Sequence, residues 1–191
     1  MVLGGLLGVV AGVLAVGGAA KLLDPHASSP MLSALGLPAR PAAARALGAF
    51  EAALGLVPFF VGGPVCAGLV AVVYAGFALA VLRLRAVAGT GVSCGCFGRS
   101  SAPPTLVHAV VDGAAALVAG AAAVAAAPGF LEVRPDLPAA GIPQLVVTFV
   151  AVGLCVAVLT VLPEALVAAR RTPAGERARP VRAFALEGTL R

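Results

Sequence analysis

Two cysteines separated by a single glycine stand out in the segment GVSCGCFGRSS, residues 91–101. A disulfide between Cys94 and Cys96 closes a smaller ring than the usual Cys-x-x-Cys motif, so we expect a strained bond that is easily reduced. Gly95 supplies the backbone freedom that such a ring requires. Arg99 lies close in sequence and favours the thiolate, which is the form that attacks disulfides. The motif therefore predicts thiol–disulfide exchange.

The same two cysteines also suit a metal site, because thiolates bind Cu(I) and zinc. Two ligands alone do not close a zinc site, and His108 is the only nearby candidate for a third ligand. We therefore rank redox chemistry above metal binding. The other two cysteines, Cys66 and Cys155, stand alone in apolar segments, where a cysteine usually behaves as a small hydrophobic residue.

Among the ionisable residues inside or at the ends of the apolar segments, five are candidates for polar contacts within the membrane: Lys21, Asp24, Glu51, His108 and Asp112. Polar groups within a bilayer usually face the interior of a helix bundle and pair with one another. We therefore expect Lys21, beside Asp24, to extend along the bundle and reach Glu51. His108 and Asp112 are four residues apart and share one helical face. They form either a proton relay or a structural cluster that fixes helix register, and both interpretations remain open.

The composition is that of an integral membrane protein. Of the 191 residues, 61% are hydrophobic and 11% are charged, with a mean hydropathy of +1.07, whereas soluble domains carry about 25% charged residues. Alanine and glycine dominate, which suits membrane helices that approach each other closely. The net charge of +5 comes from arginines near helix ends and in the C-terminal tail, where we expect lipid headgroups as partners rather than nucleic acid.

Five segments are long and apolar enough to cross a bilayer, for which about 20 residues are needed. The first has no basic residues before it, so we expect a retained helix rather than a cleaved signal peptide. We predict an all-α, polytopic membrane helical bundle with three parts: a four-helix core (1–127), a connection and fifth transmembrane helix (128–169), and a basic, disordered tail (170–191). The predicted spans are residues 2–23, 43–61, 65–84, 105–127 and 144–162.

The distribution of basic residues predicts an orientation. Lysine and arginine gather in cytoplasmic loops. In this chain they gather around the first connection, around the cysteine loop and in the tail, which holds six arginines, while the other two connections hold only Arg134. With five crossings, the three basic regions share one side. The charge count therefore predicts an external N-terminus, with the cysteine loop and the tail in the cytoplasm.

Three motifs together resemble one membrane protein family: CGCFG at 94–98, KLLDP at 21–25 and GAFEAALGL at 48–56. They are similar to those of the MauE branch of the MauE/DoxX family of redox-associated membrane proteins, over residues 2–127. The resemblance implies a four-helix bundle in a bacterial inner membrane. It also implies a role like that of the founding member, which assists maturation of methylamine dehydrogenase, a disulfide-rich enzyme, alongside a thioredoxin-like partner. Disulfide chemistry of that kind favours the cysteine loop outside the cytoplasm, opposite to the charge count.

The sequence as a whole predicts a membrane protein that exchanges electrons or disulfides with a thioredoxin-like partner. In this interpretation Cys94 or Cys96 is the attacking thiolate, Arg99 favours its ionisation, and His108 with Asp112 moves protons. A quinone is one acceptor consistent with the role, although no quinone site can be read from the sequence. Two alternatives stay open. One is a non-catalytic membrane scaffold for a redox or maturation complex, and the other is a metal-handling membrane protein.

Overall fold

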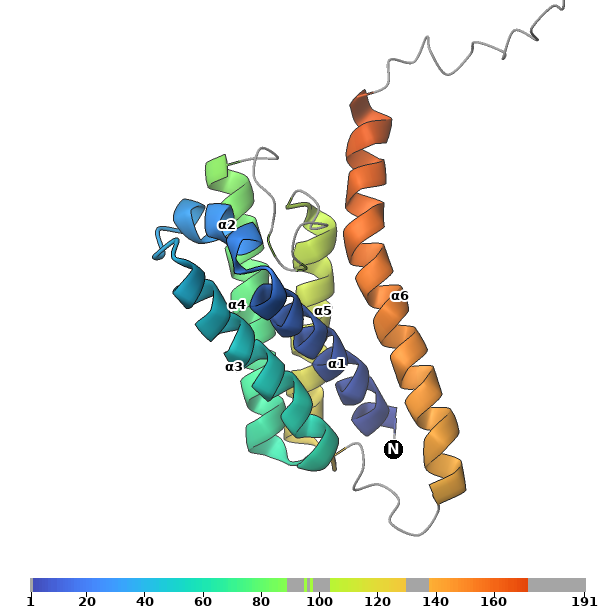
Figure 1. Ribbon diagram of the computed structural model, residues 1–191. Helices are drawn as coiled ribbons and strands as arrows, with labels where there is room; N and C mark the ends of the chain where they lie inside the picture. Colours follow the sequence, from blue (N-terminus) through green and yellow to red (C-terminus); the bar gives the residue numbers. More distant parts are fainter. Residues whose placement is uncertain (1, 89–94, 96, 98–103, 130–137, 172–191) are drawn as a thin grey trace, which may run out of the picture.

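The computed structural model describes residues 2–88, 95, 97, 104–129 and 138–171. Within these ranges the chain is a bundle of helices (Figure 1). The helices α1, α3, α4 and α5 pack together, and α6 runs along one side of them. The elements are α1 (Val2–Leu23), the 3-10 helix η1 (Pro25–Ser28), α2 (Ser29–Ala34), α3 (Pro41–Phe60), α4 (Pro64–Ala88), α5 (Leu106–Val124) and α6 (Pro138–Arg171).

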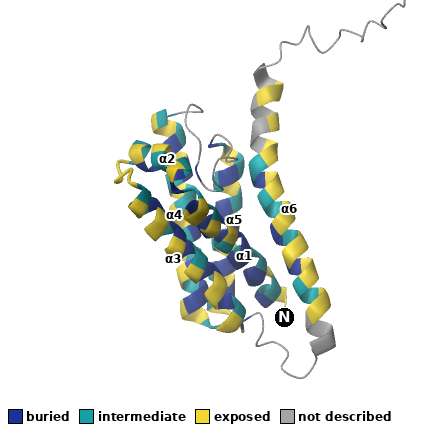
Figure 2. Cartoon of the chain, in the orientation of Figure 1, coloured by how far each residue is buried: buried dark blue, intermediate teal, exposed yellow. Residues whose placement is uncertain are grey.

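Five of these helices are long and apolar enough to cross a membrane, namely α1, α3, α4, α5 and α6. Exposed positions lie along the outer faces of these helices (Figure 2). Many of them are large apolar residues, for example Leu79 at 68%, Leu117 at 77% and Phe149 at 68% exposed. Lipid solvates such faces, whereas water does not. The predicted fold class, a polytopic helical membrane protein with five spans, is confirmed. The helix α6 begins at Pro138, six residues before the predicted start of the fifth span.

The connection after α1 contains two short helices that the sequence did not predict. Proline stands in the first turn of both η1 and α2, a position where its missing N–H costs nothing. The helix α2 ends in a Schellman motif. There Gly36 has a φ of +76°, its N–H donates to Ser33 O at 3.0 Å, and the Leu37 N–H donates to Leu32 O at 2.8 Å. The segment therefore forms a compact cap over one end of the bundle (Figure 1).

Small residues bring α1 and α3 into backbone contact. A Cβ atom at Gly18 would lie 2.5 Å from Gly48 O, and one at Gly55 would lie 2.6 Å from Ala11 O. Such spacing leaves no room for any side chain, so glycine is required where the two helices cross. This close approach brings the polar side chains that flank the crossing within reach of each other.

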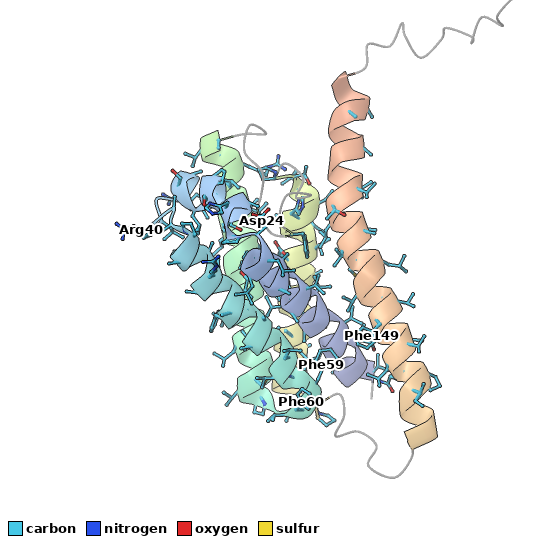
Figure 3. All side chains as sticks on the ribbon, viewed as in Figure 1. Asp24, Arg40, Phe59, Phe60 and Phe149 are labelled. Carbon is cyan, nitrogen blue, oxygen red and sulfur yellow. The ribbon has the colours of Figure 1, made fainter. Side chains whose placement is uncertain are left out.

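The helix ends that border the basic segments of the sequence lie at the same end of the bundle. In Figure 1 the α2 cap, the last turn of α4, the first turn of α5 and the C-terminal end of α6 are together, opposite the N-terminus. In Figure 3 the side chains of Asp24 and Arg40 lie near this end, while Phe59, Phe60 and Phe149 lie toward the other end. The helix α6 reaches the core through Val152, which packs where Gly12 of α1 has no side chain.

Candidate functional site

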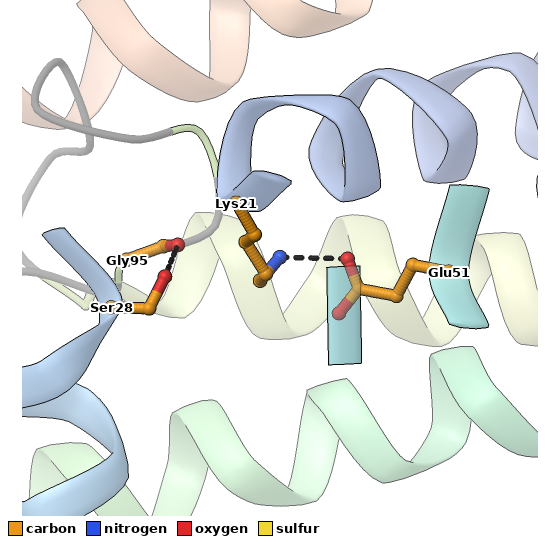
Figure 4. A network of polar contacts seen from close by, with 4 residues as sticks. All are labelled: Lys21, Ser28, Glu51 and Gly95. Atoms are coloured by element: carbon orange, nitrogen blue, oxygen red, sulfur yellow. Dashed lines mark hydrogen bonds and ion pairs between the residues drawn. The ribbon is translucent and has the colours of Figure 1, made fainter. Parts of the chain in front are cut away.

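Lys21 and Glu51 form a buried ion pair between the end of α1 and the middle of α3. Lys21 Nζ lies 2.7 Å from Glu51 Oε2, and the two side chains are 4% and 1% exposed. The contact is visible in Figure 4. Lys21 Nζ also lies 5.9 Å from the ring centre of Phe77 on α4, within the range of a cation–π interaction. The contact predicted between Lys21 and Glu51 is confirmed, and it pairs two charges that would be costly alone inside a membrane.

The first turn of α5 holds His108 in a capping box. The Thr105 N–H donates to His108 Nδ1 at 3.4 Å, and Thr105 Oγ1 lies 3.2 Å from the same nitrogen. Histidine thus takes the place that glutamate or glutamine has in the usual capping box. Because Nδ1 accepts the backbone hydrogen bond, the proton of the neutral ring is on Nε2. His108 therefore stabilises the start of α5.

Four ionisable side chains from three helices meet at one small cavity inside the bundle. Lys21 of α1, Glu51 of α3, and His108 and Asp112 of α5 all line a cavity of about 30 Å³. All four are buried, with Asp112 the most exposed at 8%. A cavity of this size has room for a water molecule. The sequence predicted two separate polar pairs, and the structure brings the two pairs to one place.

The two described residues of the CGCFG motif contact the bundle beside this cavity. Ser28 Oγ of η1 donates a hydrogen bond to Gly95 O at 3.0 Å (Figure 4). Gly95 has a φ of +65°, and a Cβ atom on it would lie 3.1 Å from Ser28 Cα. Phe97 lines the small cavity and packs against apolar residues of α1 and α6. The middle of the Cys-Gly-Cys motif is therefore anchored on the cap, and its phenylalanine covers the polar cluster.

The remaining residues of the predicted redox site, Cys94, Cys96 and Arg99, lie outside the described residues. Cys66 and Cys155 are free thiols. Cys66 lies in the first turn of α4, at the end of that helix away from the α2 cap.

Three residues of this region were not identified from the sequence: Ser28, Tyr74 and Phe97. Tyr74 of α4 lines the small cavity and donates a hydrogen bond to Val10 O of α1 at 2.7 Å. It is the single tyrosine of the chain and lies in an apolar span, where a phenolic hydroxyl needs a partner. A single tyrosine within an apolar span was therefore a sequence signal that could have identified this residue. Asp24, which the sequence grouped with the intramembrane residues, is half-buried at the start of η1.

Residues 1–128 match the family model described as methylamine utilisation protein MauE. This range contains α1 to α5 with all of the residues that line the polar cavity except Leu159, and it excludes α6. No curated protein and no solved structure shows significant similarity to the chain. The wider grouping with DoxX, stated from the sequence, stays a prediction. The matched range and the helical membrane fold agree, and the chain belongs to the MauE family.

Proposed function

We propose that this membrane protein performs thiol–disulfide exchange through Cys94 and Cys96, at the end of the bundle that carries the α2 cap. One observation carries the proposal. The residue between the two cysteines, Gly95, is held by a hydrogen bond from buried Ser28, and Phe97 covers a cavity lined by four ionisable side chains. A loop with only a connecting role has no need of such an anchor beside buried proton-binding groups.

The exchange balances without any further reagent. A thiolate of the dithiol attacks one sulfur of a disulfide in a thioredoxin-like partner, and the partner's second sulfur leaves as a thiolate. The remaining cysteine attacks the mixed disulfide, which leaves a Cys94–Cys96 disulfide and a reduced partner. Two electrons and two protons move from the dithiol to the partner, and the reverse reaction moves them back. Arg99, three residues after Cys96, favours the attacking thiolate.

The side chains that line the small polar cavity can bind the protons that the dithiol releases. His108 and Asp112 share one face of α5 and line the same cavity as Glu51, so a water molecule held there would link His108 with Asp112. Histidine gains and loses a proton near neutral pH, and a carboxylate beside it offers a second acceptor for that proton. In this account His108 and Asp112 take up a proton when a thiolate forms and return it when the thiol is restored.

A non-catalytic scaffold is the second candidate, and two contacts favour it. The capping box explains the place of His108 in the first turn of α5. The ion pair with Lys21 explains why Glu51 is tolerated inside α3. On this account the polar cluster only fixes helix register, while the α2 cap recruits a soluble redox or maturation enzyme.

The proposed setting is a bacterial inner membrane, with methylamine utilisation as the physiological context that the family's description indicates. We propose, from the arginine count, an external N-terminus and a cytoplasmic cysteine loop and tail. The thioredoxin-like partner would then approach the end of the bundle formed by the α2 cap. The helix α6 and the residues after it lie outside the matched range.

The experiment that separates the two candidates uses the four cysteines as matched pairs. One variant replaces Cys94 and Cys96 by serine, and the control replaces Cys66 and Cys155, which the structure records as free thiols. Each is purified in nanodiscs and mixed with an oxidised thioredoxin-like protein under defined thiol buffers. Exchange is expected in the control and absent in the Cys94→Ser/Cys96→Ser variant. Equal behaviour of both variants in a cellular maturation assay supports the scaffold instead.

A further inference from the structure

A second and larger cavity lies between α2, α3 and α4, and none of the proposed redox steps uses it. Its volume is about 290 Å³. Its walls are apolar, and they include Leu32 of α2, Phe50 of α3, and Phe77 and Leu84 of α4. An apolar cavity of about 150 Å³ binds benzene, so this one has room for a substituted six-membered ring.

One end of this cavity is polar. Lys21 and Glu51 line it as well as the small cavity. Glu51 Oε2 is bonded to Lys21, whereas Glu51 Oε1 is buried and has no hydrogen-bond donor among the residues that the structure describes. A buried carboxylate oxygen without a donor is costly. This end therefore lacks one hydrogen-bond donor, which a ligand can supply.

The other end of the cavity opens toward the lipid. The lining residue Phe50 is 53% exposed on the apolar outer surface of α3, and Leu37, in the connection before α3, is 52% exposed. The helices α3 and α4 are joined by a tight turn at one end and separate toward the α2 cap (Figure 1). A ligand therefore enters from the bilayer, which restricts the candidates to lipid-soluble compounds.

We propose that this cavity binds a lipid-soluble hydroxylated aromatic ring of the quinol class. The ring lies among Phe50, Phe77 and the aliphatic walls, where offset or edge-to-face aromatic contacts are available. One hydroxyl donates a hydrogen bond to Glu51 Oε1, and the ammonium group of Lys21 lies beside it as a donor to the ring oxygen. A lipid acyl chain fills the same volume but offers no donor, so it leaves Glu51 Oε1 unsatisfied.

The site lies close to the cysteine motif but does not depend on it. Met31 of α2 lines the cavity, and its Cβ would be 3.5 Å from a Cβ atom built on Gly95. One side chain thus separates the ligand from the middle of the Cys-Gly-Cys motif. Binding requires only the cavity and Glu51, so it can be tested separately from the proposed thiol–disulfide exchange.

Duroquinol is a suitable probe, because its fully methylated ring cannot add to thiols. The full chain in nanodiscs is titrated anaerobically and binding is followed by calorimetry. The test variant is Gly76→Leu, since Gly76 lines the cavity and a Cβ atom there meets nothing within 4 Å. The matched control is Gly120→Leu on α5, where a Cβ atom also meets nothing within 4 Å. A third variant, Glu51→Gln, keeps the side-chain volume and removes the carboxylate.

We expect saturable binding of one duroquinol per chain. Gly76→Leu and Glu51→Gln weaken it by about tenfold or more, while Gly120→Leu and the Cys94→Ser/Cys96→Ser variant bind as the wild type does. The proposal is overturned if the wild type shows no saturable binding, or if Gly76→Leu binds as well as the wild type. It is also overturned if a copurifying fatty acid fills the cavity and duroquinol does not displace it. If only the Cys94→Ser/Cys96→Ser variant lost binding, the ligand would bind outside this cavity, and the proposal would again be overturned.

Discussion

Ser28 donates a hydrogen bond to the carbonyl oxygen of Gly95 across 67 residues of sequence. The donor is fully buried in η1, and the acceptor lies between Cys94 and Cys96. Gly95 also adopts a φ of +65°, which favours glycine over all other residues. The contact ties the cysteine motif to the cap that the first connection forms over the bundle.

Replacing Gly95 by alanine should break this contact and change the reactivity of the dithiol. Alanine at a positive φ costs about 1–2 kcal/mol, and its Cβ would meet Ser28 Cα at 3.1 Å. We expect Cys94 and Cys96 to be alkylated faster in Gly95→Ala than in the wild type. The control is Gly36→Ala, which carries a similar φ of +76° with nothing within 4 Å of its Cβ. Equal alkylation rates in all three proteins would show that the contact between Ser28 and Gly95 does not affect the reactivity of the cysteines.

The ion pair between Lys21 and Glu51 should behave as a coupled unit. Lys21→Met alone leaves a carboxylate unpaired inside the bundle, and breaking a buried pair in this way costs about 3–5 kcal/mol. Adding Glu51→Leu removes that charge, so the double variant should regain most of the lost stability. Thermal unfolding in one detergent for the wild type, both single variants and the double variant measures the coupling. Additive losses would mean that the two residues do not stabilise each other.

Asp112 and Thr105 separate the proton-transfer role of the α5 cluster from its structural role. Asp112→Asn removes a proton-binding group from the cavity and should slow disulfide exchange by about a hundredfold, since positioned acid–base groups contribute about 10²–10⁴-fold. Thr105→Ala removes the hydroxyl half of the capping box and should cost about 1 kcal/mol of stability with little change in exchange rate. Rates of exchange across pH 5–9 provide the measurement. A similar pH profile for the wild type and Asp112→Asn would leave the cluster with a structural role only.

The predicted orientation has a direct test on intact cells. A variant in which Cys66 and Cys155 are serine retains only the two loop cysteines. A membrane-impermeant thiol reagent should label this variant only after the cells are permeabilised, because the distribution of basic residues predicts a cytoplasmic loop. Ready labelling from outside would reverse the orientation and put the dithiol in the compartment where disulfides form.

Much of the fold was predictable because bilayer physics acts on simple patterns. Five apolar stretches, set apart by proline and charge, gave five spanning helices. The pairing of Lys21 with Glu51 followed from the cost of isolated charge in lipid. The helix ends were less predictable, since Pro138 begins α6 within a segment that reads as a proline-rich connection. Proline in a first helical turn and proline in a loop look alike in sequence.

The site was harder to predict, because it depends on how helices rotate and cross. No sequence pattern indicates that Glu51 and His108 face one cavity, since this depends on how α1, α3 and α5 pack against one another. The capping role of His108 was also missed, because the usual pattern has glutamate or glutamine at that position. The long-range contact of Ser28 with Gly95 leaves no local signal at all.

The most direct test of the redox proposal is the reduction potential of the Cys94–Cys96 pair. The control protein lacking Cys66 and Cys155 is equilibrated in a series of thiol buffers, alkylated in two steps and analysed by mass spectrometry. The account predicts a reversible disulfide between Cys94 and Cys96, with a potential above the roughly −300 mV of structural disulfides. Two free thiols that persist under mild oxidation, or a bound metal in place of the disulfide, would contradict it.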